Sequence, residues 1–506
     1  MRSVHARIIV GLAVTTMLSL VLEPAVVRAA EDDDPLRKEI LALNDVTGDK
    51  PMLGEVKALY DNRGHARKLI AEAVKMSKEQ DQPLNYNGAL ILAEAARLLK
   101  EWQAATRFYQ VCAEQAVLLQ SEQKLRQAYF GRLRIIAAVY DNKKYEASAK
   151  LAKQFIEDLE HEKVGPEFTA EVMRHMVKAL AKQGKMDEAM RLVENMVKAN
   201  EDSWQNLDLK AWLFKEKKQY DEAVKAYQRA LQLVGKEEVK DSDDEGKVRK
   251  ELIEDQLQTD LIGIFTKQGK VEEANRTIDN IYKPKDNDWR NAYLKADVQQ
   301  ETGHPAAAAK IYEELLERIP KDSSVKQPQK DELLSRIRYI LSGVYIDMDR
   351  LDKATDQLKT LLAAEPDSPR YNNDLGYIMA DHDKSLDEAE KMIRKALDED
   401  RKDRKKRQSD FNTDEDKDNA AYLDSLGWVL FKKKNYKEAK KYLLDAVQDP
   451  DGQHIEIMDH LADVHLALGE KADAVATWKK ALKVETNSLR EKQKKVEVEK
   501  KLKANQ

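Results

Sequence analysis

A spacing of small residues recurs along most of this chain, and it constrains the fold more than any other feature. From about Tyr86 to Leu482, a small or aliphatic residue is followed twelve positions later by alanine, and seven positions after that by another small or aliphatic residue. Two antiparallel helices joined by a short turn approach closely only where small side chains meet, so the pattern predicts a stack of helical hairpins. The clearest copies are Ala93/Ala105/Cys112, Ala211/Ala223/Ala230, Ala296/Ala308/Leu315, Gly427/Ala439/Ala446 and Ala462/Ala474/Ala481. The weaker copies are Ile136/Ser148/Phe155, Val177/Ala189/Met196, Ile262/Ala274/Ile281, Ser342/Ala354/Leu361 and, with one extra residue in its turn, Gly376/Ala389/Ala396.

The composition and the positions of the turn residues agree with helical hairpins. Glycine and proline are scarce, at 18 and 12 of 506 residues, while strong helix formers dominate the long segments. Glycine-containing turns at 183–185, 267–270, 301–304 and 468–470 separate the two helices of four hairpins. Pro320 and Pro366 each follow the last packing position by five residues, where the second helix is expected to end.

Three segments carry a resemblance to a known family. They read LKAWLFKEKKQYDEAVKAYQRAL, LGWVLFKKKNYKEAKKYLLDAV and LADVHLALGEKADAVATWKKAL. These segments resemble tetratricopeptide repeats, and the last copies are similar to a module common in exported bacterial proteins of that family. The resemblance covers about four fifths of the chain, although the first copies are degenerate. It implies an all-α fold, a right-handed α-solenoid of about ten hairpins.

Interruptions of the period divide the chain into segments. We expect a signal peptide over 1–30, a linker and partial capping hairpin over 31–85, degenerate repeats one to four over 86–235, repeats five to eight over 251–397, and repeats nine and ten over 419–485. The segments 236–250 and 398–418 are charged and nearly free of apolar residues, so we expect mobile loops or frayed helix extensions there. A charged helical tail over 486–506 is expected to cover the last hairpin.

The first thirty residues have the pattern of a secretory signal peptide. A short basic region precedes an apolar stretch of 15 residues over 8–22, and small residues mark a cut near Ala29 or Ala30. That stretch is shorter than the roughly 20 residues that a spanning helix needs. We therefore expect a periplasmic or secreted protein without an integral membrane segment after cleavage, and an uncleaved membrane anchor is the alternative.

The sequence offers no recognisable catalytic motif. It lacks His-Glu-x-x-His, a phosphate-binding glycine loop, Cys-x-x-Cys and Gly-x-Ser-x-Gly, so we expect no enzyme, no metal and no cofactor. The single cysteine, Cys112, occupies a packing position and is interpreted as a small buried hydrophobe. His454, His460 and His465 lack the i, i+3 or i+4 spacing of a helical metal site, which favours surface or groove histidines. The basic run 401–407 is flanked by acids and has no interleaved aromatics, which favours a charged loop over a nucleic-acid site.

The resemblance also implies a concave groove lined by the first helices of successive hairpins. Projecting the family's groove positions onto hairpins six to eight gives a strip of arginines beside aromatic and amide side chains. Its members are Arg290, Tyr293, Asp297, Arg336, Tyr339, Arg370, Asn373 and Tyr377. Such a strip suits an extended peptide with acidic groups, because arginine binds carboxylates in bidentate fashion. The alternative is that these arginines pair with acids of the neighbouring hairpin.

A second pattern places an acid and a tryptophan at equivalent positions of hairpins four and nine. These residues are Asp208 with Trp212, and Asp424 with Trp428. Both a packing role and a place in the groove are compatible with this pattern. The lysine and asparagine arrangement of the carboxylate clamp, found in some chaperone-binding family members, is not reproduced here.

The leading functional hypothesis is an envelope adaptor or scaffold that binds proteins or peptides, and not nucleic acid. The alternative is an accessory subunit that recognises carbohydrate or peptidoglycan, for which Trp212, Trp428, Tyr293 and Tyr339 are the aromatic candidates. Self-association through the end hairpins is a third option.

Overall fold

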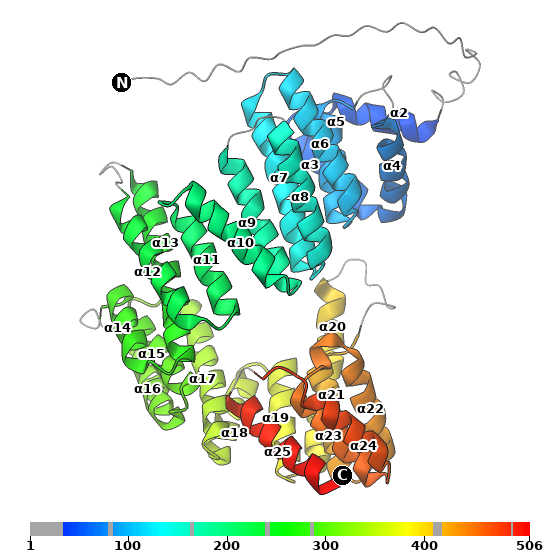
Figure 1. The fold of residues 1–506 in the computed structure, drawn as a ribbon. Helices are drawn as coiled ribbons and strands as arrows, with labels where there is room; N and C mark the ends of the chain where they lie inside the picture. Colours follow the sequence, from blue (N-terminus) through cyan, green and yellow to red (C-terminus); the bar gives the residue numbers. More distant parts are fainter. Residues whose placement is uncertain are drawn as a thin grey trace, which may run out of the picture. The chain divides into compact units, whose positions relative to one another are not determined.

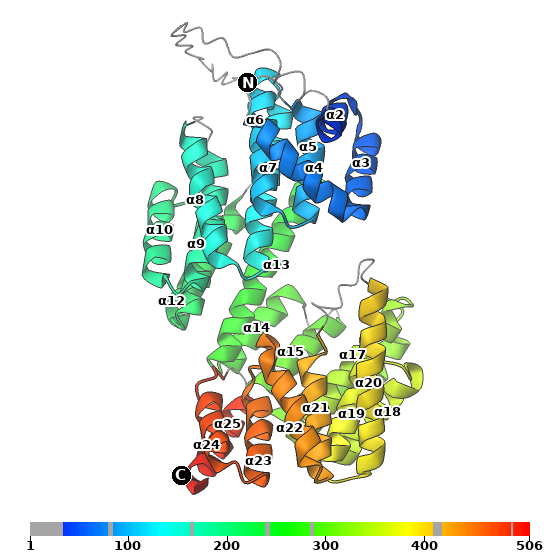
Figure 2. The same cartoon turned by 90° about the vertical axis from the view of Figure 1, so that its right-hand side faces the viewer.

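The computed structural model of the chain describes residues 34–78, 84–161, 166–237, 243–283, 288–407, 417–486 and 489–505. Every regular element within these ranges is a helix (Figures 1 and 2). The elements form two compact units, Met1–Asp202 and Ser203–Gln506. The predicted signal peptide lies outside the described residues. The all-α solenoid predicted from the repeat spacing is confirmed.

The N-terminal unit begins with short helices and continues with hairpins one to three. The first group comprises α2 (Pro35–Ala42), the 3₁₀ helix η1 (Leu43–Asp45), α3 (Asp49–Asp61) and α4 (Arg63–Met76). The hairpins are α5 (Tyr86–Leu98) with α6 (Trp102–Leu118), α7 (Glu122–Asp141) with α8 (Tyr145–His161), and α9 (Pro166–Lys182) with α10 (Met186–Ala199).

The C-terminal unit contains hairpins four to ten and one final helix. The hairpins are α11 (Trp204–Glu216) with α12 (Tyr220–Lys236), α13 (Asp244–Lys267) with α14 (Val271–Ile281), α15 (Trp289–Glu301) with α16 (Pro305–Arg318), α17 (Gln329–Asp347) with α18 (Leu351–Ala364), α19 (Pro369–Asp381) with α20 (Leu386–Arg407), α21 (Ala420–Lys432) with α22 (Tyr436–Gln448), and α23 (Ile455–Ala467) with α24 (Lys471–Ala481). The 3₁₀ helices η3 (Ile319–Lys321) and η4 (Pro450–Gly452) follow α16 and α22, and α25 (Leu489–Asn505) ends the chain.

The spaced small residues form the contact line between the two helices of each hairpin. Every position of the ten copies is buried except Ile281, which is the last residue of α14 and is half-buried, while Ile278 is buried one turn earlier. A Cβ atom added to Gly376 would lie 2.9 Å from the carbonyl oxygen of Ala389, and one added to Gly427 would lie 2.6 Å from Cγ of Leu443. The spacing is therefore a steric requirement, because the helices are too close for a larger residue there.

The turns of the ten hairpins share one backbone feature. Each contains a residue with φ in the left-handed region, which reverses the chain after the first helix. These residues are Lys100, Lys143, Gly184, Lys218, Gly269, Gly303, Asp349, Asp383, Lys434 and Gly469. Glycine adopts this conformation without a steric penalty, which explains why only four of the turns were visible as glycine signals in the sequence.

Helices extend into both segments that the sequence marks as charged insertions. The first helix of hairpin five begins at Asp244, inside 236–250, and the second helix of hairpin eight continues to Arg407, inside 398–418. Residues 238–242 and 408–416 lie outside the described residues.

The final helix α25 folds back onto the last hairpin (Figure 1). Its apolar residues Val498 and Leu502 are buried against Met458 of α23 and Trp478 of α24. The two apolar positions lie four residues apart and so share one face of an otherwise charged helix. Among the described residues, no helix has the length and apolar character needed to cross a membrane.

Candidate functional site

The arginines and tyrosines predicted for hairpins six to eight stack on one another in a row along the C-terminal unit. The guanidinium carbon of Arg290 lies 4.6 Å from the ring centre of Tyr282, that of Arg336 lies 5.5 Å from Tyr293, and that of Arg370 lies 5.4 Å from Tyr339. Each arginine of one hairpin therefore rests on a tyrosine of the hairpin before it, within cation–π range. We call Arg290, Tyr293, Arg336, Tyr339 and Arg370 the arginine–tyrosine ladder.

The charges of the ladder arginines are exposed. All three arginines are exposed. Arg290 forms an ion pair with Asp288, the residue that caps its own helix, with Nη2 and Oδ2 2.5 Å apart. Arg336 and Arg370 have no ion pair with any residue that the structure describes. The ladder thus presents guanidinium groups that are held by ring faces and are accessible to carboxylates.

Next to the ladder lies a cavity of about 640 Å³, which we call the groove cavity. Its wall is formed by first helices of five consecutive hairpins, α15, α17, α19, α21 and α23, together with α25. Five of the residues predicted for the groove line it: Asp297, Tyr339, Asn373, Tyr377 and Asp424. Arg290 and Arg336 line a separate hollow of about 360 Å³ between α15 and α17.

The aromatic residues of the groove donate hydrogen bonds to carboxylates on its wall. Tyr312 donates to Asp297, and the hydroxyl of Tyr339 donates to Oδ2 of Asp374 over 2.9 Å. The hydroxyl of Tyr377 donates to Oε1 of Glu456 over 2.9 Å. Burial raises the pKa of Asp297 and of Asp374, although these donors act in the opposite direction. The groove is consequently lined by carboxylates that accept hydrogen bonds from neutral tyrosine hydroxyls.

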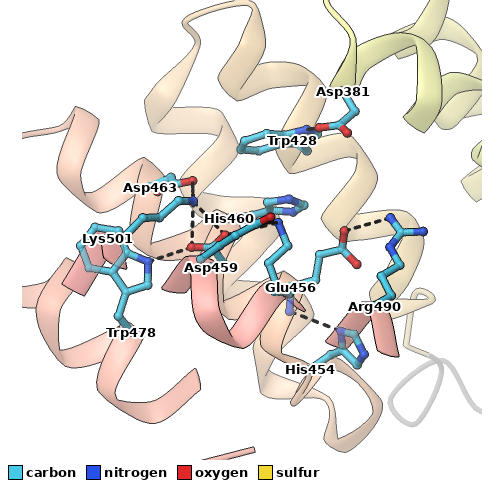
Figure 3. Close-up of polar contacts among 12 residues, drawn as sticks. Asp381, Trp428, His454, Glu456, Asp459, His460, Asp463, Trp478, Arg490 and Lys501 are labelled. Atoms are coloured by element: carbon cyan, nitrogen blue, oxygen red, sulfur yellow. Dashed lines mark hydrogen bonds and ion pairs between the residues drawn. The ribbon is translucent and has the colours of Figure 1, made fainter. Parts of the chain in front are cut away.

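A buried network joins hairpins eight, nine and ten (Figure 3). His460 Nδ1 donates to Oδ1 of Asp424 over 2.8 Å, and the imidazole stacks on the ring of Trp428 at 4.0 Å between centres. The indole Nε1 of Trp428 donates to Oδ1 of Asp381 over 2.9 Å. Burial alone would lower the pKa of His460, but the carboxylates of Asp424, Glu456 and Asp459 outweigh it and raise that pKa.

The basic face of α25 meets the acidic face of α23 (Figure 3). Lys501 Nζ lies 2.8 Å from Oδ2 of Asp459 and 2.6 Å from Oδ2 of Asp463. Arg490 Nη2 lies 3.4 Å from Oε1 of Glu456 and reaches the wall of the groove cavity. Burial opposes ionisation of Glu456, but the charges of Arg490 and His460 outweigh it and lower its pKa.

The tail helix also contributes to the groove, a place that its sequence did not reveal. Arg490 and Lys494 both line the groove cavity. The apolar pair Val498 and Leu502 was the available signal, because it fixes which face of the tail helix docks and therefore which face carries the basic residues toward the acids.

The remaining predicted residues lie elsewhere. Asp208 and Trp212 are on α11 and are not among the residues that line the groove cavity, so the two acid–tryptophan pairs do not form one site. His454 caps α23 and contacts Glu491, while His465 Nδ1 lies 2.6 Å from Oε2 of Glu470. Ligand atoms of His465, Glu470 and Asp473 lie within 4.8 Å of one another. However, the carboxylate of Glu470 is already paired with the ammonium group of Lys440, at 2.7 Å from Nζ.

Comparisons with known proteins agree with the repeat spacing. Family models described as tetratricopeptide repeat match residues 205–233, 344–404 and 419–449. A TPR repeat-containing protein of Pseudomonas aeruginosa is 27% identical over 208 residues, which is 41% of this chain and 30% of that protein. The matched region therefore spans less than a third of that relative.

Two solved structures match this chain with different coverage. A tetratricopeptide repeat protein from Parabacteroides merdae matches with 16% identity and a TM-score of 0.39, over 58% of this chain and 98% of that one. Yeast Tom70 matches with 13% identity and a TM-score of 0.43, over 93% of this chain and 96% of that one.

Proposed function

Because this chain belongs to the tetratricopeptide repeat family, we propose that it is a non-enzymatic scaffold that binds partner polypeptides in the groove of its C-terminal unit. The repeats support a role in protein–protein interaction. The observation that carries the finer proposal is the arginine–tyrosine ladder, in which tyrosine rings of one hairpin hold the guanidinium groups of the next. Such groups bind carboxylates through paired hydrogen bonds, so the proposed ligand is an extended segment with acidic side chains or a terminal carboxylate.

The buried histidine–aspartate pair of the C-terminal unit is better explained by packing than by general-base chemistry. His460 and Asp424 are hydrogen-bonded in the manner of a histidine oriented for proton transfer. However, only 3% of His460 is exposed, and Trp428 stacks on its ring. The pair therefore ties hairpin nine to hairpin ten, which fits a scaffold.

The carbohydrate alternative is not favoured by the rings of Tyr293 and Tyr339. Sugar recognition needs accessible aromatic faces, whereas Tyr293 lies beneath Arg336 and is only 8% exposed. Tyr339 packs against Tyr371 as well as Arg370, with ring centres of the two tyrosines 5.9 Å apart. These rings support cations of the same chain.

Reversing the charge of the ladder is expected to weaken the binding of acidic peptides. Peptides selected from a random library on the full chain should be rich in aspartate and glutamate. The variant R336E/R370E should bind them at least about tenfold more weakly, since each lost charge-assisted contact is worth roughly 1.5–3 kcal/mol. Affinity is measured by fluorescence anisotropy with synthetic copies of the selected peptides.

The matched control for this charge reversal is K310E/K359E. It makes the same change in net charge at exposed positions of the second helices α16 and α18. Its affinity should stay within about twofold of the wild type, because these helices do not carry the ladder. Equal binding by R336E/R370E and the wild type, with both proteins folded, would rule out the ladder as the binding surface.

We also propose that the protein acts in the bacterial cell envelope after export. The support is the pattern of the first thirty residues, with its basic region, apolar stretch and small residues. Osmotic shock of the native host should release a protein whose N-terminus begins near residue 30, as determined by mass spectrometry. Retention in the membrane fraction with an intact N-terminus would instead support the anchor.

A further inference from the structure

One part of the groove cavity combines hydrogen-bond acceptors that form no ion pair with any residue the structure describes, although the charge of Arg336 acts on Asp297 to lower its pKa at longer range. Asp297, Asn373 and Asp374 line it, and they come from hairpins six and eight, which flank hairpin seven with its Tyr339. Acidic residues alone are common in helical grooves. The amide of Asn373 provides a second and independent observation.

The side-chain amide of Asn373 has a defined orientation, and its oxygen accepts no hydrogen bond from the described residues. Its Nδ2 donates to Oδ1 of Asp374 over 3.1 Å, which sets the orientation of the amide, because the opposite orientation would face two oxygens toward each other. Its Oδ1 has no hydrogen-bond partner among the described residues, although only 5% of the side chain is exposed. A buried acceptor in this position is available to accept a hydrogen bond from a ligand.

The carboxylate of Asp374 also lacks an opposite charge in direct contact. Among the residues that the structure describes, its hydrogen-bond donors are the neutral groups of Tyr339 and Asn373. Arg370 lowers its pKa at longer range without forming an ion pair, since its guanidinium lies over the ring of Tyr339. A protonated group placed beside Asp374 would therefore gain an ionic partner and could donate to Asn373 Oδ1.

The other end of the same cavity shows how such a group is held. There the guanidinium of Arg490, from α25, lies 3.4 Å from Glu456, and its pKa is raised by the charges of Glu456, Asp347 and Asp381 against the lowering effect of burial. Asp381 is two turns along α19 from Asp374, or about 10 Å at 1.5 Å per residue. One end of the cavity is thus filled by a guanidinium of this chain, while the other has the acceptors without the cation.

We propose that Asp297, Asn373 and Asp374 form a subsite for a guanidinium or ammonium group, contributed by an arginine or lysine side chain of a partner polypeptide. The proposal rests on the scaffold function and adds a second charge preference to it. The ladder takes acidic groups and this subsite takes a basic group, so the groove selects partners that carry both. The cavity of about 640 Å³ is large enough for a side chain in addition to Arg490.

The test uses single blocked amino acids and the full chain. The probes are the N-acetyl amides of arginine, lysine and citrulline, and citrulline has the shape of arginine without its charge. Affinities are measured by ligand-detected saturation-transfer NMR, which detects weak binding to a protein of this size. Arginine and lysine amides should bind at least about tenfold more tightly than citrulline amide, and D374N should remove this difference.

Two further variants separate the subsite from general surface charge and from misfolding. The control D356N removes one charge at an exposed position of α18 and should leave the preference for arginine unchanged. N373A leaves the charge of Asp374 in place and should weaken arginine amide binding by a factor of about three to ten, because the Oδ1 acceptor is lost together with the Nδ2 donor that orients Asp374. Thermal unfolding of each variant is recorded by circular dichroism.

The outcomes distinguish the subsite from the scaffold. Equal affinity for arginine and citrulline amides, or an unchanged preference in both D374N and N373A, would overturn the subsite. If acidic peptides still bound through the ladder in that case, the scaffold function would stand alone. If neither the amides nor the acidic peptides bound, both proposals would be wrong.

Discussion

Replacing Trp478 by alanine should lower the free energy of unfolding of the C-terminal unit by about 3–5 kcal/mol, the range for truncating a large aromatic residue in a core. Trp478 is fully buried on α24, where it packs among residues of α23 and α25. Its Nε1 also donates to Oδ1 of Asp459 over 2.9 Å. The variant loses this apolar contact, leaves a cavity and removes a donor from a buried carboxylate.

The measurement is urea unfolding followed by circular dichroism, combined with hydrogen exchange read by mass spectrometry. Exchange should accelerate first in α23, α24 and α25, because hairpins in a solenoid depend mainly on their neighbours. The matched control is Trp204→Ala at the half-buried first residue of α11, with an expected loss of about 1 kcal/mol. Similar losses for the two variants would contradict the role assigned to Trp478.

Removing the carboxylate of Asp459 should detach α25 from the groove. Only 1% of Asp459 is exposed, and it accepts from Lys501 Nζ at 2.8–2.9 Å and from the indole of Trp478. Asp459→Ala leaves the indole of Trp478 without its acceptor and leaves Lys501 paired with Asp463 alone, which costs about 3 kcal/mol, the lower end of the range for breaking a buried pair. The lower end applies because the Lys501 side chain keeps 35% exposure and can turn to water.

Limited digestion with trypsin reports on this detachment, since α25 is rich in lysine. Peptides from 489–505 should appear several-fold faster in Asp459→Ala than in the wild type, because local release exposes the helix backbone. Asp445→Ala, an exposed position on α22, is the control and should digest like the wild type. An unchanged digestion rate for Asp459→Ala would mean that Val498 and Leu502 hold α25 without the ion pairs.

The core of each hairpin could be predicted from sequence because its determinant is local. Small residues at fixed separations, such as Ala462, Ala474 and Ala481, must meet when two adjacent helices reverse across a short turn, and all three are buried. The exception is Ile281, which is the last residue of α14 and is only half-buried. Helix ends depend on the following segment as well as on the spacing.

The candidate site was only partly predictable. Arg336 and Tyr293 were assigned to one strip from their repeat positions, but the sequence did not show that the guanidinium of one hairpin lies over the ring of the previous one. Asp424 and Trp428 follow the same local pattern as Asp208 and Trp212, yet only the former pair lines hollows of the groove beside His460. The two pairs differ because the following hairpin supplies His460 to Asp424, and a pattern within one hairpin carries no information about its neighbour.

The sequence alone determined that the chain is a series of helical hairpins, since steric contact between adjacent helices is decided within about thirty residues. Only the tertiary structure decided the charge arrangement of the groove. Stacking brought Asp297, Asn373 and Asp374 into one cavity and laid α25, from the end of the chain, against α23. These contacts join residues separated by tens of positions, so they depend on how successive hairpins stack and on the docking of Val498 and Leu502, neither of which a repeat period specifies.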